Sequence, residues 1–204
     1  MSRTARQSDH WEKPAAPARP SSQWTDEELM ALPDDGYKRE LVNGKIIISP
    51  AGSRHGRIIL RLSSALTIYV ERNKLGGTFD GQTGFRMRSG DALSPDISFV
   101  GKERLRDAKQ PPNGFFPGSP DLAVEVLSPG ESFGHAENKV AQYFENETKL
   151  AWVINPVNRT VQVYRGATPE KTLRTGDSLV GEDVLPGFTY AVADLFADFD
   201  FGDD

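Results

Sequence analysis

The stretch Asp121-Leu-Ala-Val-Glu-Val-Leu127 decides the fold, because it is a short apolar run interrupted by one acidic residue. Such a run, bounded by turn-forming residues, is typical of a β-strand buried on both faces of a sheet. Strand alternation places Asp121 and Glu125 on the same face, with the small Ala123 between them. The pattern therefore predicts a central strand with two carboxylates on one of its faces.

Helical and extended patterns alternate around this strand. Apolar residues recur at helical spacing from Arg54 to Arg72, and Gly76-Gly77 is expected to end that helix. Helices before and after a buried strand predict one α/β domain whose mixed central sheet is covered on both faces. The other expected elements are a capped helix from Thr25 to Pro33, hairpin strands Tyr37–Val42 and Lys45–Ser49 joined by Asn43-Gly44, strands Thr78–Arg88 and Asp96–Val100, a loop Lys102–Ser119, a helix His135–Glu145, strands Leu150–Asn155 and Thr160–Arg165, and a last helical turn Val192–Phe196.

Length and composition limit the class of protein. The 204 residues suit one domain, which we place at residues 23–204, after a polar, proline-rich tail of residues 1–22 that is expected to be disordered. No apolar run reaches the roughly 18 residues that span a bilayer, and the N-terminus lacks the apolar core of a secretory signal. The absence of cysteine excludes disulfides, thiolate catalysis and zinc-thiolate sites. These features predict a cytoplasmic protein that does not bind membranes.

Charge and motifs narrow the function classes further. Acidic residues outnumber basic ones by 29 to 24, which counts modestly against a protein that binds nucleic acid through bulk charge. Local patches matter more than the sum, and a metal site needs acidic ligands of its own. The motifs of serine hydrolases, P-loop proteins and dinucleotide-binding folds are missing, so we expect no organic cofactor.

An unpaired carboxylate inside a buried strand is costly, so it either shifts its pKa or finds a cation. For Glu125 that cation is either an Arg or Lys across the sheet or a metal ion. Pro95-Asp96 opens a second strand whose carboxylate could reach the same region. Carboxylates that converge from neighbouring strands provide the oxygen ligands that Mg²⁺ or Mn²⁺ requires.

Several segments together carry a resemblance to a known family. Pro95-Asp96 followed by Glu125 in an apolar strand looks like the PD-(D/E)XK nucleases, which share the restriction-endonuclease fold. The ordered set of segments is similar, more closely, to the Uma-type restriction endonucleases over about residues 25–163. These segments are Tyr37-Lys-Arg-Glu-Leu-Val-Asn-Gly44, Ser53-Arg-His55, Ser94-Pro-Asp-Ile-Ser98, Pro120-Asp-Leu-Ala-Val-Glu-Val-Leu-Ser-Pro129, Lys139-Val-Ala-Gln-Tyr143 and Trp152-Val-Ile-Asn-Pro156.

The resemblance implies roles for particular residues. Asp96, Glu125 and the carbonyl of Val126 would bind Mg²⁺ or Mn²⁺. The superfamily's lysine, expected two residues after Glu125, is replaced by Leu127, and Lys139 on the following helix would take its place. His135 stands one turn before Lys139, where such sequences often carry Asp, and the exchange could alter metal preference or the position of the lysine.

Further candidates surround this set. The resemblance makes Glu40 a third acidic residue near the metal, although a strand Glu is usually exposed, and makes His55 a contact to phosphate or water. Arg54, Arg57 and Arg61 form a basic stripe on the long helix, either as a solvated face or as a contact to the DNA backbone.

The sequence thus predicts a metal-dependent endonuclease that hydrolyses the phosphodiester bonds of DNA. A homodimer is expected, because cutting both strands of a duplex is commonly shared between two subunits. Leu127, His135 and the acidic net charge also fit an alternative, a nuclease-fold module that binds nucleic acid without cleaving it. A third alternative is a structural protein in which Glu125 is simply ion-paired.

Overall fold

The structure is a computed structural model that describes residues 24–32, 38–48, 52–107, 114–128 and 133–199. The tail expected at residues 1–22 lies outside these ranges. Within them, no helix has both the length and the apolar character needed to cross a membrane.

A mixed sheet of six strands forms the centre of the fold, in the order β11-β10-β9-β8-β6-β3. Neighbouring strands are antiparallel except β8 and β9, which are parallel because the helix α4 connects them. The strands with nearly continuous apolar runs, β8 and β9, lie in the middle of this sheet. All of their side chains are buried. The bounds are β3 Gly76–Asp80, β6 Ile97–Gly101, β8 Leu122–Val126, β9 Leu150–Asn155, β10 Thr160–Tyr164 and β11 Pro169–Leu173.

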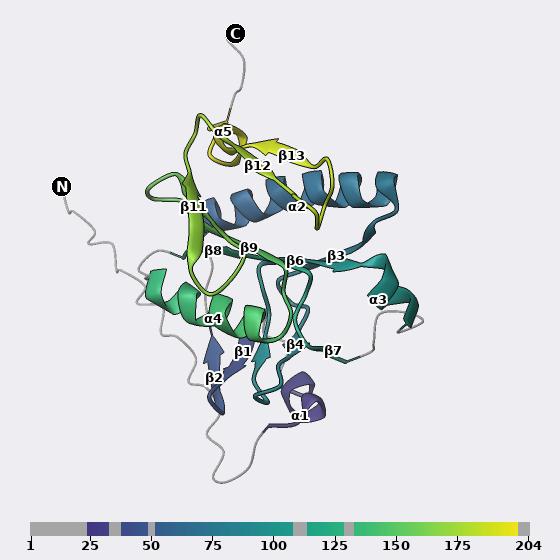
Figure 1. The fold of residues 1–204 in the computed structure, drawn as a ribbon. Coiled ribbons are helices and arrows are strands. Elements are labelled where there is room, and N and C mark those ends of the chain that lie inside the picture. The colour runs from purple at the N-terminus through teal and green to yellow at the C-terminus, as the bar shows by residue number, and fades with distance from the viewer. Residues whose placement is uncertain (1–23, 33–37, 49–51, 108–113, 129–132, 200–204) are drawn as a thin grey trace, which may run out of the picture.

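Helices cover both faces of the central sheet (Figure 1). On one face, α2 (Ser53–Asn73) packs Ile58, Leu62, Leu66 and Val70 against the sheet, and α5 (Val192–Leu195) and the pair β12 (Ser178–Val180) and β13 (Thr189–Ala191) extend this layer. On the other face, α4 (Phe133–Glu145) packs against residues that include Ala123 and Leu127. The alternation expected for the central strand is confirmed, because Leu122, Val124 and Val126 face α2.

A second sheet of five strands, in the order β2-β1-β5-β4-β7, stands beside α4. Its first hairpin turns at Asn43 and Gly44, whose φ values of 50° and 71° are those of the tight turn expected there. The short helix α1 (Asp26–Met30) covers this sheet with Leu29 and begins with the expected capping box at Thr25. The strand bounds are β1 Arg39–Val42, β2 Lys45–Ile48, β4 Phe85–Arg86, β5 Ala92–Leu93 and β7 Phe116–Pro117.

Three expectations about element boundaries were wrong. The α2 helix ends at Asn73 and is capped by Lys74, which takes the left-handed conformation with φ of 53°, and Gly76-Gly77 begin β3 instead of ending the helix. The strand expected from Thr78 to Arg88 is divided into β3 and β4, which belong to different sheets. The segment expected as a loop from Lys102 to Ser119 contains α3 (Lys102–Asp107) and β7, apart from residues 108–113, which lie outside the described ranges. Pairing between strands that are distant in the sequence fixes these boundaries, and local sequence patterns do not show that pairing.

Close backbone contact at the start of β3 predicts a steric requirement for glycine. A Cβ added to Gly76 would lie 2.1 Å from the carbonyl oxygen of Val100 on β6, so the strand pair would have to move. We expect Gly76→Ala to lower the free energy of unfolding by about 1–3 kcal/mol in urea titrations. The control is Gly56→Ala, where an added Cβ meets no atom within 4 Å and the exposed helix should gain about 0.5–1 kcal/mol. Equal stability of the two variants would contradict this assignment.

Candidate active site

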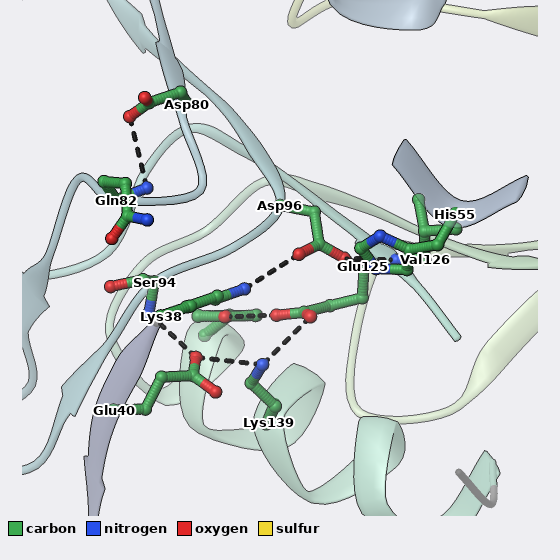
Figure 2. A network of polar contacts seen from close by, with 11 residues as sticks. Lys38, Glu40, His55, Asp80, Gln82, Ser94, Asp96, Glu125, Val126 and Lys139 are labelled. Carbon is green, nitrogen blue, oxygen red and sulfur yellow. Dashed lines mark hydrogen bonds and ion pairs between the residues drawn. The ribbon is translucent and has the colours of Figure 1, made fainter. Parts of the chain in front are cut away.

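A cluster of buried charged side chains lies where β6 and β8 move apart (Figure 2). The two strands pair at Ile97 and Val124, so Val126 lies beyond the last paired residues. Asp96 comes directly before β6, and Glu125 lies within β8. Pro95 has no N–H to donate and restricts its predecessor to extended backbone, which suits the start of a strand. This local geometry brings the carboxylates of Asp96 and Glu125 to the same end of the sheet.

Asp96 receives three contacts from different elements. The ammonium nitrogen Nζ of Lys38, directly before β1, lies 2.8 Å from Oδ1. The backbone N–H of Val126 donates to Oδ2 at 2.8 Å, and Nε2 of His55 lies 3.2 Å from the same oxygen. Burial favours the protonated acid, but the charge of Lys38 and the hydrogen bond from His55 outweigh it and hold the pKa of Asp96 well below its usual value. Asp96 is therefore an ionised carboxylate over the working pH range.

Lys139 connects the two other carboxylates. Its Nζ atom lies 2.9 Å from Oε1 of Glu40 on β1 and 2.9 Å from Oε2 of Glu125 on β8. The hydroxyl of Tyr143, one turn later on α4, donates to Oε1 of Glu125 at 2.6 Å. Glu40 is held in turn by the backbone N–H of Ser94 at 2.9 Å. The second sheet, the central sheet and α4 thus meet at one ammonium group.

The charges and the burial in this cluster shift the pKa values of its acidic and basic groups in different directions. Burial opposes the charged form of Lys139, but Glu125 and Glu40 raise its pKa, so the ammonium stays protonated. Burial also disfavours ionised Glu40, yet Lys139 and Lys38 lower the pKa of that carboxyl. The pKa of Glu125 is raised by burial, and the nearby Asp96 and Glu40 add to the shift. Among these three carboxyl groups, only Glu125 binds its proton more readily than an exposed glutamate.

The donor set fits a small hard cation. With all three carboxyls ionised, three negative and two positive charges leave one net negative charge, if His55 is neutral. In an extended strand the N–H and C=O of one residue point to the same edge, so the carbonyl of Val126 faces the edge where its N–H meets Asp96. Carboxylate and carbonyl oxygens suit Mg²⁺ and Mn²⁺.

Lysine nitrogens limit how many side chains such a cation could use. In the described part of the chain, no three His, Asp or Glu side chains are arranged to hold a metal together. Lys139 contacts an oxygen of Glu40 and one of Glu125, and Tyr143 donates to the other oxygen of Glu125. Lys38 contacts one oxygen of Asp96, while the N–H of Val126 and His55 contact the other, so a cation would use the second lone pair of an oxygen that already has a partner. Mg²⁺ is commonly held by one or two carboxylates and keeps several waters, so this donor set fits Asp96 and Glu125 with the Val126 carbonyl.

The structure brings five of the residues singled out in the sequence to one place: Asp96, Glu125, Val126, Lys139 and Glu40 lie within the cluster, and His55 joins it from the first turn of α2. Leu127 instead packs in the core against α4, among residues that include Ala136 and Val140. The position of the superfamily's lysine is thus filled by an apolar contact, and an ammonium group approaches Glu125 from α4.

The three arginines of the basic stripe on α2 make different contacts. Arg61 donates to the backbone carbonyls of Asp194 and Ala197 at 2.8 and 2.7 Å, so it links the end of α5 to α2. Arg57 lies over the ring of Phe199, with its Cζ atom 3.4 Å from the centroid. Arg54 is exposed at the start of the helix. The stripe was expected either as a solvated face or as a contact to the DNA backbone, and the contact to DNA stays a prediction. Arg54 and Arg57 make no hydrogen bond to the backbone within the described residues.

Two residues of the cluster were not expected from the sequence. Lys38 was expected only as part of the strand Tyr37–Val42, and no role was predicted for Tyr143. The only signal for Tyr143 was its spacing of four residues from Lys139, which places both side chains on one helix face. Asp121, the other carboxylate on the face of Glu125, lies at the opposite end of β8 and bonds to Gly101 and Lys149.

The chain is similar to known proteins in sequence and in fold. The model of the Uma2 family, described as "Putative restriction endonuclease", matches residues 26–193. A solved structure of a protein described as a putative nuclease belonging to DUF820, from Anabaena variabilis ATCC 29413, superimposes with a TM-score of 0.72 at 23% sequence identity. The match covers 85% of this chain and 97% of that one, and it shows that the two share a fold. No curated protein matches the chain.

The bridging position of Lys139 predicts a pH-dependent stability defect. Lys139→Met would leave Glu40 and Glu125 buried without their cation, and breaking such a buried pair costs about 3–5 kcal/mol. In the variant both folded-state pKa values would lie above their unfolded values, so the folded state would gain protons, and stability, as the pH falls. We expect the deficit in urea unfolding to be largest near pH 8 and to shrink toward pH 5.

The control for this prediction is Lys102→Met, which removes a lysine that is half exposed and 3.9 Å from its partner Glu103. Its effect should be small at both pH values, because an exposed pair contributes little. A deficit in Lys139→Met that does not change between pH 8 and pH 5 would mean that the ammonium does not neutralise the two carboxylates.

Proposed function

The chain belongs to the Uma2 family of "Putative restriction endonuclease" proteins, and on that premise we propose that it is a Mg²⁺- or Mn²⁺-dependent endonuclease that hydrolyses phosphodiester bonds of DNA. The observation that carries the proposal is the meeting of Asp96, Glu125 and Lys139 at the diverging ends of β6 and β8. Buried carboxylates with strongly shifted pKa values, brought together from separate elements, are typical of a catalytic site.

The acidic groups would hold the metal ion in this proposal. Asp96 and Glu125 would bind it through carboxylate oxygens, together with the carbonyl of Val126, while Glu40 keeps Lys139 in place. A bound divalent ion would lower the pKa of an attacking water and neutralise charge that develops on the phosphate oxygens. His55 and Lys38 position Asp96 by holding its two oxygens from opposite sides.

The protonation states decide what the lysines can do. Lys139 and Lys38 both have raised pKa values, once the neighbouring carboxylates have outweighed the effect of burial. An ammonium that stays protonated cannot take a proton from water, so we assign Lys139 to orienting the water and offsetting negative charge at the phosphorus. Lys38 has the more exposed side chain, at 17% against 6% for Lys139, and is the better placed of the two to meet a phosphate from solvent.

His55 is assigned to holding Asp96 in this proposal. Its Nε2 lies 3.2 Å from Oδ2 of the ionised Asp96. Nδ1, on the other side of the ring, is buried and has no hydrogen-bond partner in the described part of the chain, so an attacking water has no access to it.

The proposal predicts that Asp96→Asn abolishes metal-dependent cleavage. We would incubate plasmid, linear and single-stranded DNA with Mg²⁺ or Mn²⁺ and follow the products on gels. The variant should lose at least about a hundredfold in rate, because it removes a metal ligand. Asp107→Asn is the matched control, since Asp107 is an exposed residue at the end of α3, and it should cut like the wild type. An unchanged rate in Asp96→Asn would remove this residue from the site.

The alternative function is a nuclease-fold module that binds nucleic acid and does not cleave it. The observation that favours it is Leu127, which packs in the core where the superfamily carries its lysine. Metal binding and DNA binding by a folded wild-type protein that cuts none of the three substrates would support this alternative. The homodimer and the cytoplasmic location expected from the sequence stand as proposals, and sedimentation of the purified protein tests the first of them.

A further inference from the structure

A cavity of about 480 Å³ opens beside the candidate active site. It lies between the first turns of α2, the turn that joins β9 to β10, and the segment after α5. A smaller hollow of about 210 Å³ is lined by His55 and Leu127 and shares Arg54 and Val157 with the larger one. The two hollows therefore adjoin, and together they lead from the residue beside Asp96 to the C-terminal segment.

The larger cavity carries a local positive charge in a protein whose net charge is −5. Arg54, Arg57 and Arg159 line it, and Asp198 is the only acidic residue among the described residues of its lining. None of the three arginines forms an ion pair with a described residue, although Arg159 donates a hydrogen bond to the carbonyl of Phe196 at 2.8 Å. Three guanidinium groups that have no carboxylate partner among the described residues, around a space of this volume, suit an anionic ligand.

Apolar surface adjoins these charges. Val157, in the β9–β10 turn, is 77% exposed, and Phe199, over which Arg57 stacks, is 69% exposed. Exposed aromatic and aliphatic side chains interleaved with arginines are the combination that binds unpaired nucleotides, whose phosphates and base faces are both accessible. In a duplex the base faces are stacked on one another and cannot use such a surface.

We propose that these adjoining hollows bind a single DNA strand and lead it to the catalytic cluster. Arg54, Arg57 and Arg159 contact its phosphates, and the side chains of Phe199 and Val157 contact a base. The inference rests on the proposed nuclease function, because the bound strand is taken to be the substrate. It names the substrate class as single-stranded or locally unpaired DNA. Arg61, held by two backbone carbonyls, takes no part.

The test measures binding separately from cleavage. A fluorescently labelled oligothymidylate and a duplex of equal length are titrated with the full chain in EDTA, by anisotropy, at several salt concentrations. Each phosphate contact to a single strand contributes about 0.7 to the slope of log K against log salt, so the double variant Arg54→Gln, Arg57→Gln should flatten the slope by about 1.4. Phe199→Ala should weaken binding of the single strand by about tenfold and leave the duplex almost unchanged.

The matched control is Arg72→Gln, which removes the same charge from the other end of α2 and should leave the slope unchanged. An equal slope in the wild type and the double variant would overturn the proposal, as would equal losses on single strand and duplex in Phe199→Ala. No binding of oligothymidylate by the wild type would also overturn it. Cleavage by the same preparations is assayed in parallel. Binding as expected without cleavage would contradict the proposed nuclease function and support the strand path. Cleavage without the slope change would support the nuclease function and contradict the strand path.

Discussion

The ammonium group of Lys139, 2.9 Å from a carboxylate oxygen of both Glu40 and Glu125, is the interaction on which the rest of the site depends. Two buried carboxylates from different sheets could not stay ionised side by side without a cation between them. Lys139 supplies that cation from α4, and Tyr143 fixes Glu125 from the same helix face. The contact therefore joins β1, β8 and α4, so the position of the second sheet and the geometry of the carboxylates are set together.

The second requirement of the site is a backbone N–H and C=O that take no part in sheet pairing. The separation of β6 and β8 supplies these groups. Because pairing stops at Ile97 and Val124, the N–H of Val126 is taken by Asp96 and the carbonyl of Val126 faces the same edge. Lys38 and His55 then hold Asp96 ionised. The fold thus concentrates oxygen atoms and net negative charge at one end of its central sheet, while the adjoining hollow lined by Arg54 and Arg57 carries positive charge. This is the charge distribution that the proposed metal centre and the proposed strand path would require.

Elements whose signals are local could be predicted from the sequence, and contacts between distant segments could not. The alternation around Glu125, the Asn43-Gly44 turn and the cap at Thr25 follow from periodicity and turn chemistry, and the structure agrees with all three. Lys38 lies 58 residues from its partner Asp96, and nothing near it in the sequence marks the contact. Arg61 shows the same limit, since helical spacing alone could not reveal its two backbone acceptors from the C-terminal segment. The family resemblance, which the comparisons bear out, supplied the long-range grouping that the local patterns lacked.

The central claim is that the carboxylates of Asp96 and Glu125 form a metal centre and are not merely partners of the two lysines. The most direct test is a calorimetric titration of Mn²⁺ into the folded wild type and into Glu125→Ala, with the fold of each checked by circular dichroism. The account predicts that the wild type binds the metal at a site that the variant lacks. Equal binding, or no binding by either folded protein, would contradict it and would leave the cluster as a structural network of ion pairs.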